Sequence, residues 1–274
     1  REFVLKREDV PTDKVAITIH ENVGSDWDYA ATDAQAMFGQ SSFAIPFIPS
    51  KYNSKALIVQ WSDSLLLRAV SRVDVPKGKH RILLRSRTRS RLFVDGKNIA
   101  QLKTGYGSTS AHGKVSTAPK DHGGRTRFLR PGMQEVVVEF ESLGSQHFFL
   151  LEAFVGGKGK RPETGDLSVS ISVDGAPFKL LSPTHNIALS DGNWVDYAEK
   201  SQESIRVFNQ AARAAIGIKE SGKWKKRHQR TRELAAQKQS VPMPTRAPGY
   251  PANNAIDYFI NARLNVAGRR PTAL

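Results

Sequence analysis

The chain has 274 residues, of which 39% are hydrophobic, and this is enough apolar material for one large domain or for one domain with an appendage. It contains no cysteine, which excludes disulfides, thiolate nucleophiles, cysteine-ligated zinc and covalent c-type haem attachment within these residues. Its formal charge of +15 favours acidic partners such as nucleic acid, anionic lipid, acidic polysaccharide or an acidic subunit, or else provides only a soluble basic surface.

The sequence gives little direct information on targeting. No apolar run approaches the roughly 20 residues that a membrane-spanning helix needs, so we expect no membrane span. The chain begins with Arg1 and shows no signal-peptide pattern, and we interpret it as a processed or excised piece of a longer protein.

Residues 15–155 have the pattern of a β domain. Short runs rich in Val, Ile, Leu and Phe alternate with turn residues, and Asp95-Gly96 predicts a tight hairpin turn. The runs lie at 15–20, 56–61, 65–70, 80–85, 91–96, 134–142 and 147–155. We therefore predict a mainly β fold, namely an antiparallel β-sandwich of the jelly-roll kind.

Two further segments surround these strands. Residues 104–127 are polar and rich in Gly, Ser and Thr, which predicts a long loop inserted between strands. Residues 166–182 show strict alternation followed by Asp174-Gly175, which predicts one more hairpin.

From about residue 192 the hydrophobic spacing becomes helical. Spacings of four and three alternate along a seam, and Ser190 or Asp191 can cap the first turn. The seam consists of Trp194, Ala198, Ser201, Ile205, Phe208, Ala212 and Ala215. It fails at 217–222 and resumes in another phase, which predicts either one long bent helix or an antiparallel helical hairpin over 192–238.

The second half of this region is strongly basic. Residues 219–233 carry seven Lys or Arg residues against two Glu residues. Such a run on a helix forms either a solvated face or a contact surface for an anionic partner. The candidate basic contact surface comprises Lys223, Lys225, Lys226, Arg227, Arg230 and Arg232.

The C-terminal part changes character again. Residues 240–254 contain four prolines, which predicts an extended Pro-rich linker or strap. Residues 254–271 then predict an amphipathic helix with Ile256, Phe259, Ile260 and Leu264 on one face.

Motifs for catalysis or metal binding are weak. The seven histidines are scattered without paired metal-ligand spacing, and there is no Gly-x-Ser-x-Gly and no P-loop. Glu139 and Glu141 face the same side of a strand, and such a pair is either the paired carboxylates of a glycosidase or, more commonly, two surface glutamates. We therefore expect no catalysis, no metal and no cofactor in this chain. The pattern does not favour nucleic acid as a partner, because the aromatic residues fall in strand cores.

Residues 25–28 offer a different kind of candidate. Asp26 and Asp28 flank Trp27, and such a set either holds a hard cation beside a sugar-stacking ring or forms an acidic loop around a half-buried aromatic residue.

The segment 78–97, followed by 129–142 and 147–155, resembles the protective-antigen-type (PA-fourteen) β-sandwich domain. Members of that family show Ser-Asp-Asp-Gly-Ser and then a strand such as Arg-Leu-Tyr-Ile-Asp-Gly-Lys. The matching residues here are Ser86, Ser90, Arg91, Leu92, Asp95 and Gly96. The resemblance implies a sandwich that binds a ligand at the loop after Ser86.

This sequence departs from that family at the metal-binding positions. Arg87 and Thr88 stand in place of the Asp-Asp pair, and Arg89 stands in place of the family's Gly. Because arginine and threonine cannot replace two carboxylates around calcium, we expect this loop to contact an anion or a carboxylate-bearing partner. The candidate ligand-binding residues are Arg87, Thr88, Arg89, Asp95, Lys97 and Trp27.

The order of segments over about 15–274 is similar to the middle of large planctomycete surface or periplasmic proteins. Residues 78–97 and 246–264, including the motif at 255–264, carry this resemblance. It implies an extracytoplasmic protein, at the periplasm or the cell surface. Its partners would be other domains or subunits of the parent assembly, with haem c elsewhere in the parent protein.

These observations predict five parts. They are a sandwich domain at 1–160, an additional hairpin on or beside it at 161–190, a charged long helix or helical hairpin at 191–239, a Pro-rich linker at 240–253, and the start of a helical domain at 254–274. We interpret the chain as a non-catalytic binding or scaffolding module that contacts a glycan, a cell-surface polymer or a partner domain. The alternatives are a module that binds a polyanion, either acidic polysaccharide or nucleic acid, and an accessory part of a redox or hydrolytic enzyme complex.

Overall fold

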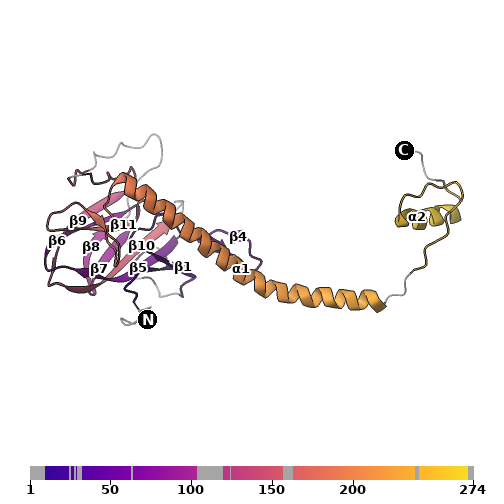
Figure 1. The fold of residues 1–274 in the computed structure, drawn as a ribbon, viewed down its shortest axis with the longest axis horizontal. Helices are drawn as coiled ribbons and strands as arrows, with labels where there is room; N and C mark the ends of the chain where they lie inside the picture. The colour runs from indigo at the N-terminus through magenta and orange to yellow at the C-terminus, as the bar shows by residue number, and fades with distance from the viewer. Residues whose placement is uncertain are drawn as a thin grey trace. The chain divides into compact units, whose positions relative to one another are not determined.

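The computed structural model describes residues 10–24, 26–27, 29, 33–62, 64–103, 120–123, 125–156, 163–237 and 241–270. The chain divides into two compact units, Arg1–Gly217 and Ile218–Leu274, with the division falling inside a long helix. The first unit is built on two antiparallel sheets, and the strands of both are visible in Figure 1.

The larger sheet has six strands in the order β2-β1-β5-β10-β7-β8, all paired antiparallel. Its strands are β1 (Val15–Glu21), β2 (Ala36–Gln40), β5 (Ser64–Val75), β7 (Ser90–Val94), β8 (Lys97–Leu102) and β10 (Ser145–Gly156). The long strands β5 and β10 pair from end to end, from Ser145 opposite Val75 to Gly156 opposite Ser64.

The smaller sheet has four strands in the order β12-β11-β6-β9. Its strands are β6 (Gly78–Ser86), β9 (Gln134–Ser142), β11 (Ser168–Val173) and β12 (Lys179–Leu180). A separate two-stranded ribbon joins β3 (Lys51–Tyr52) to β4 (Ile58–Val59).

The hydrophobic core fills the space between the two sheets. Alternate residues of each long strand point inward, because side chains on a strand face opposite sides with period two. On β10 the inward series is Phe149, Leu151, Ala153 and Val155, and on β6 it includes Ile82 and Leu84. These residues confirm the antiparallel sandwich that the sequence pattern predicts.

A second apolar layer covers the outer face of the smaller sheet. Leu83 of β6 contacts a cluster that contains Phe178, Leu189 and the first turns of the helix α1 (Asp191–Gln237). Trp194 and Tyr197 of α1 are buried in this cluster, and Ile205 reaches the main core. The N-terminal turns of α1 are therefore part of the first unit.

Both predicted Asp-Gly hairpin turns are present. Asp95 and Gly96 have φ of 51° and 85°, and Asp174 and Gly175 have φ of 49° and 78°. Positive φ at two successive positions gives a turn whose twist matches that of the paired strands, and Asp-Gly is among the sequences that adopt it most readily.

Other expectations need correction. The run at 56–61 forms only the two-residue strand β4, and the short strands β2 and β3 have no counterpart in the prediction. Residues Asp191–Gln237 form one continuous helix, so the alternative of a helical hairpin over 192–238 is wrong. In the predicted loop at 104–127, residues 104–119 and 124 lie outside the described residues, and the others form neither helix nor strand.

The second unit contains the rest of α1, an extended Pro-rich segment and the helix α2 (Ala255–Val266). Asn254 caps α2, and a capping box links its side chain to Asp257. The Pro-rich segment packs on α2, because the Asn261 side chain donates to the Pro251 carbonyl at 2.7 Å and the Tyr250 hydroxyl donates to the Arg269 carbonyl at 2.9 Å. Ile256, Phe259 and Ile260 of α2 remain exposed.

Candidate binding site

The loop between β6 and β7 holds three of the predicted ligand-binding residues. Arg87 forms an ion pair with Glu163 at 2.8 Å, and Arg89 forms one with Asp26 at 2.8 Å. The Thr88 hydroxyl donates a hydrogen bond to the Phe154 carbonyl. Both arginines thus contact carboxylates of the same chain, and both carboxylates are exposed to solvent.

Trp27 lies near this loop and packs against its neighbours. The Arg91 guanidinium lies over the indole at 4.2 Å from the ring centroid, and the Phe154 ring lies at 4.8 Å. Contacts of this kind stabilise a partly buried aromatic side chain. They favour a packing role for Trp27 over sugar stacking, and Asp28 lies outside the described residues.

The Glu152 carboxylate is the common partner of several side chains near Trp27. Its two carboxylate oxygens contact Arg68 at 3.0 Å and Arg91 at 2.6 Å, and it also accepts a hydrogen bond from the Tyr29 hydroxyl at 2.9 Å. Burial raises the pKa of Tyr29, and the charge of Glu152 raises it further. This buried carboxylate therefore makes polar contacts with three neighbouring side chains.

Asp95 and Lys97 are separated from the other predicted residues. They lie at the far end of β7, a strand of five residues that spans about 17 Å. The Asp95 carboxylate contacts His147 Nδ1 at 2.6 Å and accepts from the Phe148 amide at 2.9 Å, while Lys97 is exposed. The structure thus divides the predicted ligand-binding residues between two ends of one strand.

A groove of about 590 Å³ opens beside the 86–89 loop, between residues 46–48, the 163–166 segment and the first turns of α1. Glu163 links the two features, since it lines the groove and pairs with Arg87. The remaining lining residues are Pro46, Phe47, Ile48, Arg130, Thr164, Gly165, Asp166, Trp194, Val195, Ala198, Glu199 and Gln202. Its lining combines apolar side chains with carboxylate, amide and guanidinium groups.

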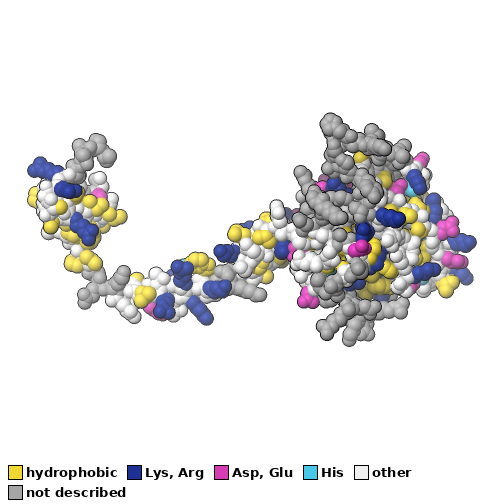
Figure 2. Space-filling view, turned by 180° about the vertical axis from the view of Figure 1, so that it is seen from behind, with side chains coloured by type: hydrophobic (Ala, Val, Ile, Leu, Met, Phe, Trp, Pro, Cys, Tyr) yellow, Lys and Arg dark blue, Asp and Glu magenta, His cyan; other side chains and the backbone are white. Residues whose placement is uncertain are grey.

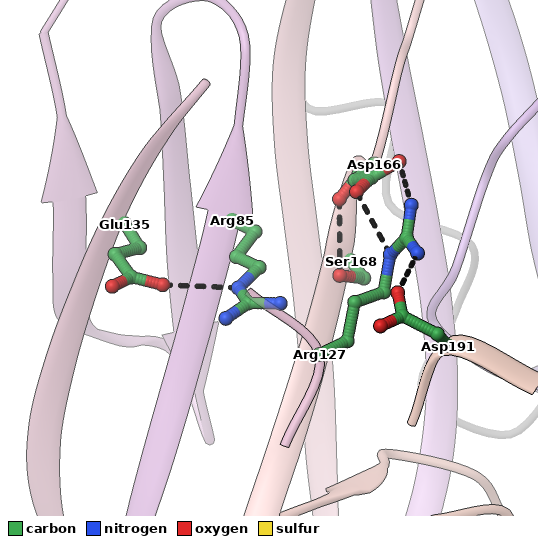
Figure 3. Close-up of polar contacts among 6 residues, drawn as sticks. All are labelled: Arg85, Arg127, Glu135, Asp166, Ser168 and Asp191. Carbon is green, nitrogen blue, oxygen red and sulfur yellow. Dashed lines mark hydrogen bonds and ion pairs between the residues drawn. The ribbon is translucent and has the colours of Figure 1, made fainter. Parts of the chain in front are cut away.

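Arg127 contacts residues from two segments that line this groove. Its Nε donates to Asp166 at 3.1 Å, and its Nη1 pairs with Asp191, the first residue of α1 (Figure 3). Its guanidinium also lies 5.4 Å from the Trp194 ring centroid. Since Asp166 and Trp194 both line the groove, Arg127 connects its two sides, and a buried charge pair of this kind requires well-defined geometry.

A second buried pair lies next to this network. Arg85 Nε donates to Glu135 at 3.0 Å (Figure 3). The other Glu135 oxygen contacts His122 Nε2 at 2.8 Å. The Nη1 and Nη2 atoms of Arg85 are buried and make no hydrogen bond within the described part of the chain. Burial lowers the pKa of Arg85, and the Glu135 charge opposes that effect.

The candidate basic contact surface lies on the part of α1 that belongs to the second unit. All six of its side chains are exposed. Within the described ranges, no three His, Cys, Asp or Glu side chains lie close enough together to hold a metal ion. None of the described helices is long and apolar enough to cross a membrane.

Sequence reasoning missed most of the groove. Trp194 appears in the helical seam, but its spacing indicates only that it is buried. Phe47, Glu199 and Gln202 belong to no motif, and they come from two segments that are far apart in the sequence. Among the predicted ligand-binding residues, Arg87 alone has a described contact with a residue of the groove lining, through its ion pair with Glu163.

No protein-family model matches this sequence. No curated protein matches it either.

Solved structures with distantly similar folds do exist. An anti-sigma factor domain-containing protein has a TM-score of 0.41 at 10% identity, over 69% of this chain and 51% of that chain. A PA14 sugar-binding domain from an RTX adhesin has a TM-score of 0.39 at 11% identity, over 64% and 97% of the two chains. A β-glucosidase from Kluyveromyces marxianus has a TM-score of 0.38 at 9% identity, over 59% and 16%.

This chain thus spans about half the length of the anti-sigma factor protein and a small part of the glucosidase. Likenesses at these TM-scores do not indicate a shared activity.

Proposed function

We propose that the first unit is a non-catalytic binding module and that its groove takes a carbohydrate chain. The observation that carries this proposal is the composition of the groove, whose lining contains aromatic and aliphatic side chains together with carboxylate and amide groups. The proposal fits the wider prediction that the chain contacts a glycan or a surface polymer.

The apolar residues of the lining suit one face of a sugar. Phe47 is 38% exposed, beside Pro46 and Val195, and offers an open aromatic surface to the C–H face of a pyranose. Trp194 also lines the groove but is only 6% exposed, so it offers little surface to a ligand. Apolar contact combined with a few placed polar groups is the usual composition of small-ligand sites.

The polar residues of the lining suit the hydroxyl groups of the sugar. Glu163, Glu199 and Gln202 present acceptors and donors, and sugar hydroxyls can satisfy both. Arg87 forms an ion pair with Glu163. The predicted 86–89 loop therefore contributes to the groove indirectly, because Arg87 orients one groove carboxylate. We infer a positioning role for Arg87 and no direct contact for Trp27.

Calorimetric titration of the full chain with a panel of neutral oligosaccharides tests this proposal. Phe47→Ala and Gln202→Ala should each weaken binding about tenfold, a loss of about 1.4 kcal/mol. Phe128→Ala and Gln210→Ala are matched controls, since both residues are exposed and neither lines the groove. Their affinities should remain unchanged.

Two results would overturn the proposal. One is the absence of binding by every oligosaccharide at millimolar concentration. The other is an equal loss in the groove variants and the controls, with melting curves showing that all four variants are folded. Added salt should leave this binding nearly unchanged, because the ligand is neutral.

The wider setting rests on the sequence resemblance. We propose an extracytoplasmic location, within a larger protein whose other domains or subunits are its partners. An accessory role in a redox or hydrolytic complex, with haem c elsewhere in that protein, stays a prediction.

A further inference from the structure

The part of α1 in the second unit is a helix without a core. Every side chain from Ser221 to Gln237 is exposed. Figure 2 shows Lys and Arg side chains along the exposed helix. Packing of an apolar face ordinarily stabilises a helix, so a helix exposed on all sides leaves its whole surface available for a partner.

The basic residues of this helix fall on two different faces. A helix turns about 100° per residue, so Lys223, Lys226, Arg227 and Arg230 lie within an arc of about 100°. We call these four residues the basic stripe. It runs for about 10 Å along the axis. Lys225 and Arg232 lie on the opposite face.

Three residues of the stripe are available for an external anion. Among the described residues, Lys226, Arg227 and Arg230 form no ion pair. The nearby acid Glu233 accepts a hydrogen bond from Gln229 at 3.0 Å. Four cations on one face, with no carboxylate among them, attract a chain of negative charges more strongly than scattered cations do.

Two classes of anionic partner fit poorly. A lipid surface requires an apolar face to insert, but Ile218, Trp224 and Leu234 lie at three well-separated angles around the helix. Single-stranded nucleic acid stacks successive bases on several aromatic rings, but residues 221–237 carry one tryptophan, Trp224, and no Phe or Tyr.

We propose that the basic stripe binds a linear acidic polysaccharide, through charge contacts along the helix axis. Such a polymer presents anionic groups at regular intervals and requires neither an apolar face nor a stacking ring. The stripe meets that requirement with its row of exposed cations. This surface belongs to the second unit and does not depend on the groove, so either proposal can fail without the other.

Two double variants of the full chain test the stripe. Lys226→Glu/Arg230→Glu reverses two charges of the stripe, and Lys225→Glu/Arg232→Glu reverses two charges on the opposite face. Both change the net charge equally. Binding of heparin and of polygalacturonate is measured by calorimetry at several salt concentrations, and far-UV circular dichroism confirms that both variants keep the helix.

The first variant should lose at least about tenfold in affinity, and its slope of log K against log salt should fall by about two. The second variant should keep its affinity within about threefold. Equal losses in both variants would show attraction by net charge alone and overturn the proposal. Tighter binding of duplex DNA or of phosphatidylserine vesicles, or no binding of either polysaccharide at low salt, would also overturn it.

Discussion

Arg85 is the clearest case of a charge whose surroundings determine its effect. It is 1% exposed and forms one ion pair, with Glu135, while two of its nitrogen atoms have no described partner. Burying a charge costs several kcal/mol unless a partner and hydrogen bonds compensate for it. The pair therefore limits which substitutions the smaller sheet tolerates.

We expect Arg85→Met to lower the free energy of unfolding by about 3 kcal/mol, because it leaves Glu135 buried without its cation. The double variant Arg85→Met/Glu135→Met should recover part of this loss, since no charge is then stranded. Urea unfolding measures both. Arg87→Met is the control, because its pair with Glu163 is exposed and should contribute less than about 1 kcal/mol. Equal losses at Arg85 and Arg87 would contradict this prediction.

Tyr197 provides a pH-dependent contribution. Burial raises the pKa of its hydroxyl above the ordinary value, and the hydroxyl donates to the Ala44 carbonyl at 2.9 Å. A raised folded pKa contributes stability that is fully present below the unfolded value of about 10 and is lost as pH rises towards the folded pKa.

Tyr197→Phe should therefore cost about 1 kcal/mol of unfolding free energy at about pH 8, because the hydrogen bond is lost. The difference between wild type and variant should narrow at about pH 11, where ionisation of Tyr197 favours the unfolded wild type. Urea unfolding at both pH values measures the difference. A difference that is the same at both would show that Tyr197 has an ordinary pKa in the folded chain.

At the scale of elements, the two parts of the single helix α1 differ in physical character. Its N-terminal turns bury Trp194, Tyr197 and Ile205 against the sandwich, and its later turns bury nothing among the described side chains. The seam predicted from the sequence is correct as far as Phe208, whereas Ala215 is exposed. The helical spacing identifies a face that can be buried, but only packing decides where burial ends.

Two isoleucines of this helix make a matched pair. Ile205→Ala should lower the free energy of unfolding of the first unit by about 3 kcal/mol, because Ile205 is 6% exposed within the core. Ile218→Ala should change it by less than about 0.5 kcal/mol, because Ile218 is 73% exposed. Chemical denaturation followed by tryptophan fluorescence measures both. Similar costs at the two positions would mean that Ile218 is packed in solution.

The strands show the same division between pattern and packing. β9 coincides with its predicted bounds, because Val136, Val137 and Val138 lie together between clear turn signals. β2 was missed, because it is a short edge strand with Met37 exposed and only Phe38 and Gln40 buried. Edge strands have one paired side and weak alternation, so their sequence signal is faint.

The contacts of the candidate binding residues are harder to predict from the sequence than the strands are. The loop at 86–89 was located from its motif, and its arginines lie where that placement predicts, between β6 and β7. Their carboxylate partners, Glu163 and Asp26, are distant in sequence, and no local pattern names them. The groove and the Arg127 network are likewise made of segments that meet only in three dimensions.

At the scale of the whole molecule, the chain joins a sandwich unit to a basic helical unit. Alternation with period two, Asp-Gly turns and helical spacing were enough to establish a mainly β protein with a long helix, because these signals act over a few neighbouring residues. The charge of +15 was equally plain from composition.

Tertiary contacts alone established which charges are neutralised and which face solvent. Arg85, Arg87, Arg89 and Arg127 contact carboxylates from other segments, whereas the basic stripe lies on the exposed later turns of α1. The physical reason is that the strength of an ion pair depends on distance and burial, and both are fixed only when remote segments of the chain come together.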